Sequence, residues 1–315
     1  MSATSTTAAP GIRPRLDDLI ELRHQAVALG VASRHLVNTS FSGLYASVFR
    51  GMGLEYEEAR EYRPGDDIRQ MDWKVTARSR RPHVKVYREE REREVVLCVD
   101  TGPHMQFGTR GTFKSVQAAR AAALLGWAAN RNHDRVGGLV LGTGGREGVA
   151  YYRPTRGRRS LWRLLHGLSA EPDAEGGRYP LDQALKMLDR AVATGSVIFV
   201  IADFNFDPQP LEIPLGRLRQ RHSVVLIPVD DPRERELPPM GRVVFRGPRG
   251  EKIEVDTDDA EARAAYAERW RRTRQALLNM AGSLGLAVIP IDTGEDVHRS
   301  LQRGMEQLNR MHRTQ

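Results

Sequence analysis

Apolar residues are spaced in two different ways along this chain, and the change between them divides the sequence. Residues 95–99 and 197–202 are apolar at every position, and each run is followed directly by an aspartate, Asp100 or Asp203. Continuous apolar runs of this length are typical of strands buried on both faces, as in a parallel sheet covered by helices. From residue 95 onward such runs alternate with segments of helical periodicity, which predicts an α/β fold.

This α/β region is expected to form a doubly wound, mostly parallel sheet with helices on both faces, because strands and helices alternate along it. A β-hairpin is also predicted, because Gly-Pro-Arg-Gly separates two short runs of high β-propensity. The hairpin strands are predicted at 243–245 and 252–255; the sheet strands at 95–100, 135–142, 148–153, 196–203, 223–229 and 286–291; and the helices at 113–130, 160–168, 181–193, 211–220, 259–282 and 297–311.

The sequence before residue 95 predicts a different arrangement. Its first residues are rich in Ser, Thr and Ala, and residues 1–14 are expected to form a disordered tail. Apolar side chains fall on one helical face over 15–38, and residues 83–87 alternate as in a half-exposed strand. We therefore expect an N-terminal helix and a small β-rich module over 15–94, followed by the α/β domain over 95–315.

Composition narrows the class of protein. The chain has one cysteine, Cys98, which excludes disulfides within the chain and a cysteine-based zinc site and suits the cytoplasm. Its longest apolar runs are about eight residues, short of the roughly 20 that cross a bilayer, so no membrane span is expected. It has neither a Walker-type phosphate loop nor a Gly-x-Ser-x-Gly nucleophile sequence.

The net charge of +8 raises the question of nucleic-acid binding. No zinc finger, helix-turn-helix signal or series of aromatic residues accompanies the basic residues. Such a run is more often a solvated face or a protein-docking patch, so nucleic acid is kept only as an alternative partner. The clearest basic run without an acid consists of Arg153, Arg156, Arg158, Arg159 and Arg163.

Asp100 and Asp203 are the first candidates for chemistry. Ligands of parallel α/β sheets bind outside the carboxyl ends of the strands, where both residues are expected. Two carboxylates there can share a cation, and Mg²⁺ or Mn²⁺ is the ion that oxygen ligands favour. The alternative is that each aspartate only caps the turn that follows it. A metal-dependent hydrolase that uses His104 as a base rests on the same residues.

A second feature is a dense mixture of charged and aromatic residues around one turn, over 60–78. Such groups can form a network of charge-assisted hydrogen bonds or an exposed recognition surface. Its distinctive positions are Arg60, Tyr62, Pro64, Gly65, Asp66, Asp67, Arg69, Asp72, Trp73, Ala77 and Arg78.

These positions, followed by an apolar strand that ends in Asp100, resemble the bacterial family called domain of unknown function 58. The match extends from about residue 54 to residue 203. The resemblance implies a von Willebrand factor A-like domain with an extra β-rich module before its first core strand. It also implies a partner, since members are commonly encoded beside MoxR-type AAA+ ATPases. A non-enzymatic adaptor for such an ATPase and its client protein is therefore the leading hypothesis.

The resemblance also implies a metal-ion-dependent adhesion site, and this chain departs from its pattern. The family of folds has Asp-x-Ser-x-Ser after the first strand, a later Thr and a further Asp. Asp100 and Asp203 match the two carboxylates, whereas Gly102, His104 and Tyr179 stand where hydroxyl residues are expected. We therefore expect a degenerate site with weakened affinity for Mg²⁺ or Mn²⁺.

Overall fold

The computed structural model describes residues 11–26, 54–62, 66, 71–79, 81–89, 93–142, 148–171, 179–246 and 251–313. The chain forms two compact units, residues 48–92 and the remainder. Each unit is considered by itself below.

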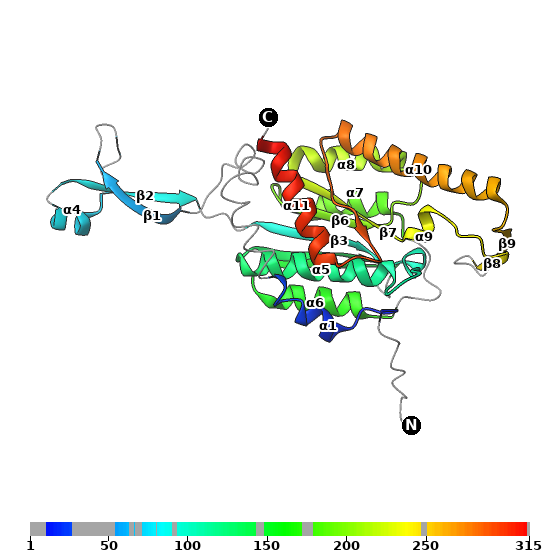
Figure 1. The fold of residues 1–315 in the computed structure, drawn as a ribbon. Coiled ribbons are helices and arrows are strands. Elements are labelled where there is room, and N and C mark those ends of the chain that lie inside the picture. The colour runs from blue at the N-terminus through cyan, green and yellow to red at the C-terminus, as the bar shows by residue number, and fades with distance from the viewer. Residues whose placement is uncertain are drawn as a thin grey trace, which may run out of the picture. The chain divides into compact units, whose positions relative to one another are not determined.

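A seven-stranded sheet is the centre of the larger unit (Figure 1). Six of its strands follow the order β10-β7-β6-β3-β4-β5, and β11 also pairs with β7. All of these pairings are parallel except that of β4 with β5. The strands are β3 (Glu94–Asp100), β4 (Arg135–Leu141), β5 (Val149–Thr155), β6 (Val197–Ala202), β7 (Ser223–Asp230), β10 (Ala287–Val288) and β11 (Ile291–Asp292).

This strand order confirms the predicted doubly wound α/β fold. Counted from β3, the order is 3-2-1-4-5-6, the arrangement in which the chain first winds outward in one direction and then in the other. The reversal takes place between β3 and β6, which are neighbours in the sheet. A topological switch point therefore lies at the carboxyl ends of these two strands.

Helices cover both faces of the sheet, as predicted (Figure 1). The helices α5 and α6 pack on one face and α7, α8 and α10 on the other, while α11 packs against α5 and β11. Their bounds are α5 (Lys114–Arg131), α6 (Arg158–Ser169), α7 (Leu181–Ala191), α8 (Gln209–Arg221), α10 (Ala260–Ser283) and α11 (Val297–Arg313). Among the described residues, no helix has the length and apolar character needed to cross a membrane.

The continuous apolar pattern of β3 follows from this burial on both faces. Val96 and Cys98 belong to the cluster formed with α7, α8 and α10, whereas Leu97 lies on the opposite side, near Gly126 of α5. Burial raises the pKa of the Cys98 thiol, so this cysteine is a core residue and not a nucleophile.

The first helix belongs with the larger unit. We expected it to group with the β-rich module, but α1 (Leu16–Glu21) packs against α5 and α6. Leu19 is buried, and its carbonyl oxygen accepts a hydrogen bond of 2.9 Å from Trp127 Nε1. The helix α1 ends at Glu21, well before the predicted end at residue 38. Residues 27–38 of the prediction lie outside the described residues.

Two local predictions need correction. The last predicted strand, 286–291, is divided into β10 and β11, because Pro290 cannot donate a ladder hydrogen bond. The short helix α9 (Pro232–Arg235) follows β7 and was not predicted. Proline at its first position and an aspartate before it are ordinary signals of a helix start.

The predicted hairpin is confirmed as β8 (Arg242–Arg246) and β9 (Lys252–Asp256). The two strands pair only with each other among the described strands. In their antiparallel register Val243 faces Val255 and Phe245 faces Ile253, so four apolar side chains share one face.

The smaller unit contains the antiparallel strands β1 (Leu54–Glu61) and β2 (His83–Glu89) and the helix α4 (Trp73–Ser79). The β-rich character was predicted, but α4 was not. Residues 40–53, which also fall within the predicted module, lie outside the described part of the chain.

Candidate functional site

The switch point brings Asp100 and Asp203 together, as the sequence predicted. Asp100 is the last residue of β3, and Asp203 follows β6 directly. Both side chains are buried at the carboxyl edge of the sheet, and His104 lies between them. The two carboxylates therefore contact other groups of the protein and are not open to solvent.

Two donors occupy the Asp100 carboxylate. The Gly102 backbone N–H donates to its Oδ1 atom at 2.9 Å, and His104 Nε2 lies 2.9 Å from its Oδ2 atom. Because a carboxylate can only accept, we assign the imidazole hydrogen to Nε2. The same nitrogen lies 3.8 Å from Asp203 Oδ1, so His104 spans the two acids.

The replacement of two hydroxyl positions by Gly102 and His104 has a common geometric cause. A Cβ atom at residue 102 would lie 3.0 Å from His104 Cε1 and 3.1 Å from Asp100 Oδ1. The imidazole thus uses the space that a serine side chain at 102 would need. His104 reaches this position from the short 3₁₀ turn η2 (Pro103–Met105).

Lys114 supplies the charge that balances Asp203. Its side chain is fully buried, with Nζ at 3.2 Å from Asp203 Oδ2 and 2.5 Å from Glu234 Oε1. Burial lowers the pKa of Lys114, but the carboxylates of Asp203 and Glu234 outweigh burial and raise it above its ordinary value. Lys114 is therefore a charged ammonium between two acids.

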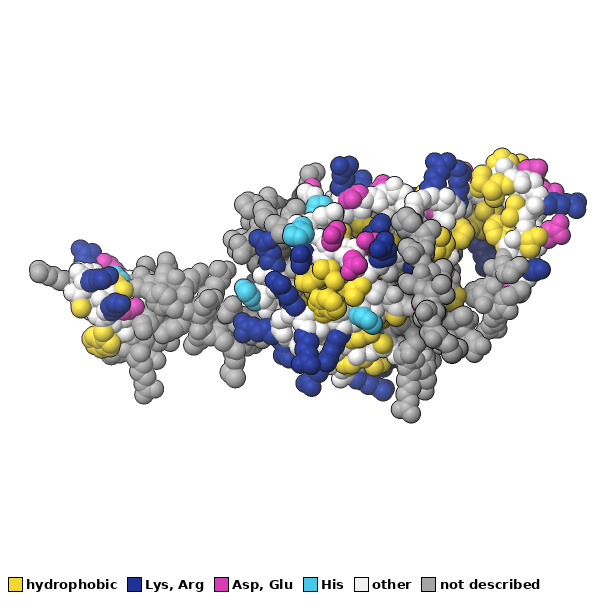
Figure 2. Space-filling model, turned by 90° about the horizontal axis from the view of Figure 1, so that it is seen from below, with side chains coloured by type: hydrophobic (Ala, Val, Ile, Leu, Met, Phe, Trp, Pro, Cys, Tyr) yellow, Lys and Arg dark blue, Asp and Glu magenta, His cyan; other side chains and the backbone are white. Residues whose placement is uncertain are grey.

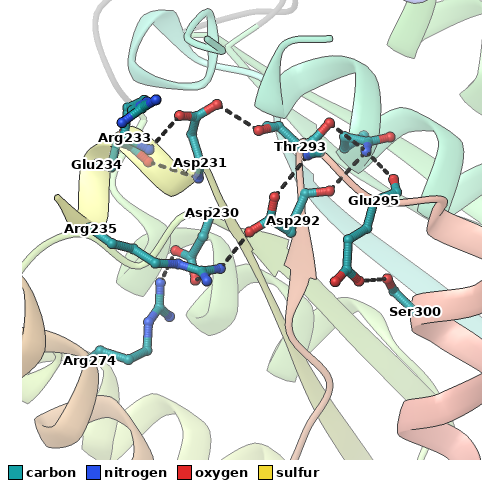
Figure 3. Close-up of polar contacts among 12 residues, drawn as sticks. Asp230, Asp231, Arg233, Glu234, Arg235, Arg274, Asp292, Thr293, Glu295 and Ser300 are labelled. Atoms are coloured by element: carbon teal, nitrogen blue, oxygen red, sulfur yellow. Dashed lines mark hydrogen bonds and ion pairs between the residues drawn. The ribbon is translucent and has the colours of Figure 1, made fainter. Parts of the chain in front are cut away.

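A second ion-pair group follows along the same edge (Figure 3). Arg274 donates to Asp230, the last residue of β7, and Arg235 Nη2 lies 2.7 Å from Asp292 Oδ2. The centroid of the Trp270 ring lies 5.6 Å from the guanidinium carbon of Arg235 and 5.4 Å from that of Arg274. Burial raises the pKa of Asp230, and the nearby arginines offset part of this effect.

Asp231 joins three loops at this edge. It caps α9 by accepting from the Arg233 N–H at 2.9 Å, and it accepts from the Thr293 hydroxyl at 2.6 Å (Figure 3). It also accepts from the Thr109 hydroxyl at 2.7 Å. Burial acts to raise the pKa of Asp231, but these hydrogen bonds outweigh burial and lower it. Glu234 completes the capping box and also contacts Lys114, so α9 holds the ammonium in place.

As arranged, these residues do not fit Mg²⁺ or Mn²⁺. Each oxygen of Asp100 and Asp203 already lies within hydrogen-bonding distance of a donor, the last being the Asn205 N–H at 3.2 Å from Asp203 Oδ1. The Lys114 ammonium would repel a divalent cation bound to Asp203. Among the described residues, no group of three or more His, Cys, Asp or Glu is placed to hold a metal ion.

Tyr179, the residue expected at the Thr position, is half-buried and packs against the hydrophobic cluster under α7 and α8. Lys114 and Glu234 were missed by the sequence reasoning. One signal was available: a lysine at the first residue of the Ala-rich helix α5 is placed unfavourably for the helix dipole and therefore calls for acidic partners.

The family-motif residues divide into structural and exposed groups. Asp72 is buried and caps α4, because its Oδ1 accepts the backbone N–H groups of Lys74 and Val75 at 3.0 and 3.1 Å. Trp73 is 69% exposed, and Ala77 and Arg78 are also exposed.

The other motif residues are less informative. Tyr62 and Asp66 are partly exposed, Arg60 lies in β1, and Pro64, Gly65, Asp67 and Arg69 lie outside the described residues.

Part of the predicted basic run lines a groove on α6. Arg158, Arg159 and Arg163 surround a cavity of about 560 Å³ together with Trp162 and Tyr152. Figure 2 shows this side of the molecule, where Lys, Arg and His side chains lie around hydrophobic ones. This basic and aromatic lining favours an anionic partner, either a nucleic acid or an acidic protein.

Comparison with known proteins identifies the family. The model of the family described as "Protein of unknown function DUF58" matches residues 58–276. The uncharacterized proteins Rv1480 of Mycobacterium tuberculosis and Mb1516 of Mycobacterium bovis are each 36% identical to this chain over 235 residues, which cover 72% of this chain and 72% of theirs.

Solved structures similar to this chain include von Willebrand factor A-type proteins. BatB from Bacteroides thetaiotaomicron, a conserved hypothetical protein, is similar over 69% of this chain and 99% of its own, with 14% identity and a TM-score of 0.43. A von Willebrand factor type A protein from Catenulispora acidiphila is similar over 70% of this chain and 43% of its own, with 14% identity and a TM-score of 0.37. The family match, which includes the motif and the strand ending in Asp100, confirms the resemblance: the chain belongs to the DUF58 family of proteins of unknown function.

Proposed function

We propose that this chain is a cytoplasmic, non-enzymatic protein-interaction module that acts as a partner of a MoxR-type AAA+ ATPase in the maturation or remodelling of a client protein. The chain belongs to the DUF58 family. The resemblance to that family implies such a partner, since members are commonly encoded beside MoxR-type ATPases. The carboxyl edge of the sheet supports the non-enzymatic part of the proposal. Its buried acids are paired with basic groups of the same chain, so they are not free to act on a substrate.

The hairpin β8–β9 is the observation that carries the proposal. Its four apolar cross-strand residues share one face, and Ile253 on that face is 59% exposed. Met240, just before the hairpin, and Val244, on its opposite face, are also more than half exposed. A two-stranded hairpin is marginally stable by itself, and apolar exposure on such an element is typical of a surface that a partner protein covers.

Hydrogen bonds hold the base of the hairpin to α10, which favours presentation of this face in a fixed direction. Thr257 is fully buried, donates from Oγ1 to the Gly241 carbonyl at 2.7 Å and accepts from the Met240 N–H at 2.8 Å. Arg263 of α10 donates to the Thr257 carbonyl at 2.6 Å. A fixed surface loses less conformational entropy when a partner binds.

The hydrolase alternative is less well supported by the geometry. A general base must reach a substrate proton, yet His104 Nε2 is directed at the buried Asp100 carboxylate. The metal that this mechanism requires would have to share Asp203 with the Lys114 ammonium. We therefore assign these residues a structural role.

Affinity capture with a hairpin variant tests the proposal. Tagged wild type and Ile253→Asp are used to capture proteins from the native cytosol in the presence of ATP and Mg²⁺. The matched control is Ile213→Asp, because Ile213 is an equally apolar residue that is 71% exposed on α8. We expect the wild type and the control to retain a MoxR-type ATPase, and Ile253→Asp to lose most of it.

The result that would contradict the proposal is equally specific. If the wild type captures nucleic acid and no ATPase, the basic groove on α6 becomes the functional surface. Equal capture by Ile253→Asp would remove the hairpin from the interface. Thermal unfolding of the three proteins confirms that each is folded before capture.

A further inference from the structure

We propose that Lys114 is the resident cation of the switch-point site and replaces the divalent metal ion of a metal-ion-dependent adhesion site. Metal binding at this site can be measured without knowing the identity of the partner protein.

The position of the ammonium is the first argument. Nζ of Lys114 contacts one carboxylate from the end of β6 and one from α9, at 3.2 and 2.5 Å, and the side chain has no exposed surface. Transfer of an unpaired ammonium into such a place is strongly unfavourable, whereas a position between two acids compensates the charge. The lysine therefore neutralises Asp203, as a bound metal ion would.

The origin of the lysine in the fold is the second argument. Lys114 begins α5, where the positive end of the helix dipole disfavours a cation. The first turn of α5 contains no acidic residue that could offset this effect. Its placement is thus explained by Asp203 and Glu234, which are 89 and 120 residues away in the sequence.

The arrangement around Asp100 is the third argument. His104 and the Gly102 N–H occupy both of its oxygens, and the His104 ring fills the space next to Gly102. A hydroxyl at 104 could bind a metal ion through its oxygen, whereas the imidazole Nε2–H only donates to the Asp100 carboxylate. Protein groups therefore satisfy both carboxylates, and the site needs no ion to be complete.

Manganese binding provides a direct test, because Mn²⁺ is paramagnetic and prefers the same oxygen ligands as Mg²⁺. Free Mn²⁺ is measured by electron paramagnetic resonance during titration of the wild type, Asp203→Asn, Lys114→Ala and Lys114→Ala/Asp203→Asn. We expect the wild type and Asp203→Asn to bind Mn²⁺ equally weakly. Lys114→Ala should bind at least about tenfold more tightly than the wild type, and the double variant should lose that gain.

Two results would overturn the inference. One is Mn²⁺ binding by the wild type that Asp203→Asn abolishes, which would show that a metal ion enters despite Lys114. The other is a folded Lys114→Ala protein with no increase in Mn²⁺ affinity. If Lys114→Ala does not fold, the comparison of the wild type with Asp203→Asn decides, because equal weak binding supports the inference and Asp203-dependent binding overturns it.

Discussion

At the scale of single residues, the buried ionisable groups of this chain differ in whether a partner compensates their burial. Asp203 and Lys114 compensate each other, and the Asp231 carboxylate accepts several hydrogen bonds. His222 is different: it is buried at the end of α8, and neither ring nitrogen has a hydrogen-bond partner in the described part of the chain. Its neutral form is therefore the one that the fold accommodates.

His222 predicts a specific dependence of stability on pH. Burial, with a contribution from Arg221, lowers the pKa of His222 to about 4, below its ordinary value of 6.5. The unfolded chain therefore binds a proton that the folded chain resists, so stability is complete above pH 6.5 and decreases as the pH falls toward 4. Relative to His222→Leu, the wild type should lose about 2 kcal/mol of unfolding free energy between pH 7 and pH 5.

Urea unfolding of both proteins at the two pH values checks this prediction. Parallel decreases for the wild type and His222→Leu would show that His222 is protonated as readily in the folded protein as in the unfolded chain.

The sequence predicted only part of the switch-point site. Asp100 and Asp203 could be predicted because each ends an apolar run, and strand ends meet at one edge of a parallel sheet. His104 could be noted only as a loop residue, since its contact with Asp100 depends on the turn at 103–105. Lys114 and Glu234 could not be paired from the sequence, because the sheet alone brings α5 and α9 together.

At the scale of elements, β4 shows how closely the strands approach one another. Gly137 and Gly138 lie where the register between β4 and β5 shifts. A Cβ atom at Gly138 would lie 2.0 Å from the Leu97 carbonyl oxygen in β3. Glycine is thus required here for close backbone approach, which is one of the meanings of a glycine inside a strand.

Alanine substitutions at Gly138 and Gly282 are predicted to change the stability of the protein in opposite directions. Gly138→Ala should destabilise the protein by about 2 to 3 kcal/mol, because the backbone that it meets cannot move aside. The matched control is Gly282→Ala in α10, where a Cβ atom meets no described atom within 4 Å apart from the nearby backbone of its own helix. That change should stabilise the protein by about 0.5 kcal/mol through higher helix propensity.

Denaturant unfolding of the two alanine variants measures both effects. A stable Gly138→Ala protein would mean that β3 and β4 are farther apart than the structure has them.

Elements with a periodic or turn signal were predictable, whereas the short helices α4 and α9 were not. The helix α5 and the hairpin β8–β9 have strong periodic or turn signals, and both were found close to their observed bounds. The helices α4 and α9 have seven and four residues, too few for a helical period to be recognised. Their caps, Asp72 and Asp231, carry the usable signal, but aspartates are equally common in turns.

At the scale of the whole molecule, charge is distributed according to place in the fold. The acids at the carboxyl edge are paired with lysine, histidine and arginine, whereas Arg158, Arg159 and Arg163 gather around the groove on α6. The groove on α6, and not the switch-point site, is therefore where basic side chains gather at the surface. A nucleic acid bound there would give binding that weakens steeply with salt, which separates it from docking on the apolar hairpin.

Because the proposed role of this chain depends on a protein partner, direct binding is the decisive measurement. Titration of the wild type with the purified MoxR-type ATPase of the same organism, by calorimetry in ATP and Mg²⁺, should give a Kd in the range of about 1 µM or below. The affinity should fall at least about tenfold for Ile253→Asp and remain unchanged for Ile213→Asp. Absence of binding by the wild type at ATPase concentrations up to about 100 µM would contradict the proposed function.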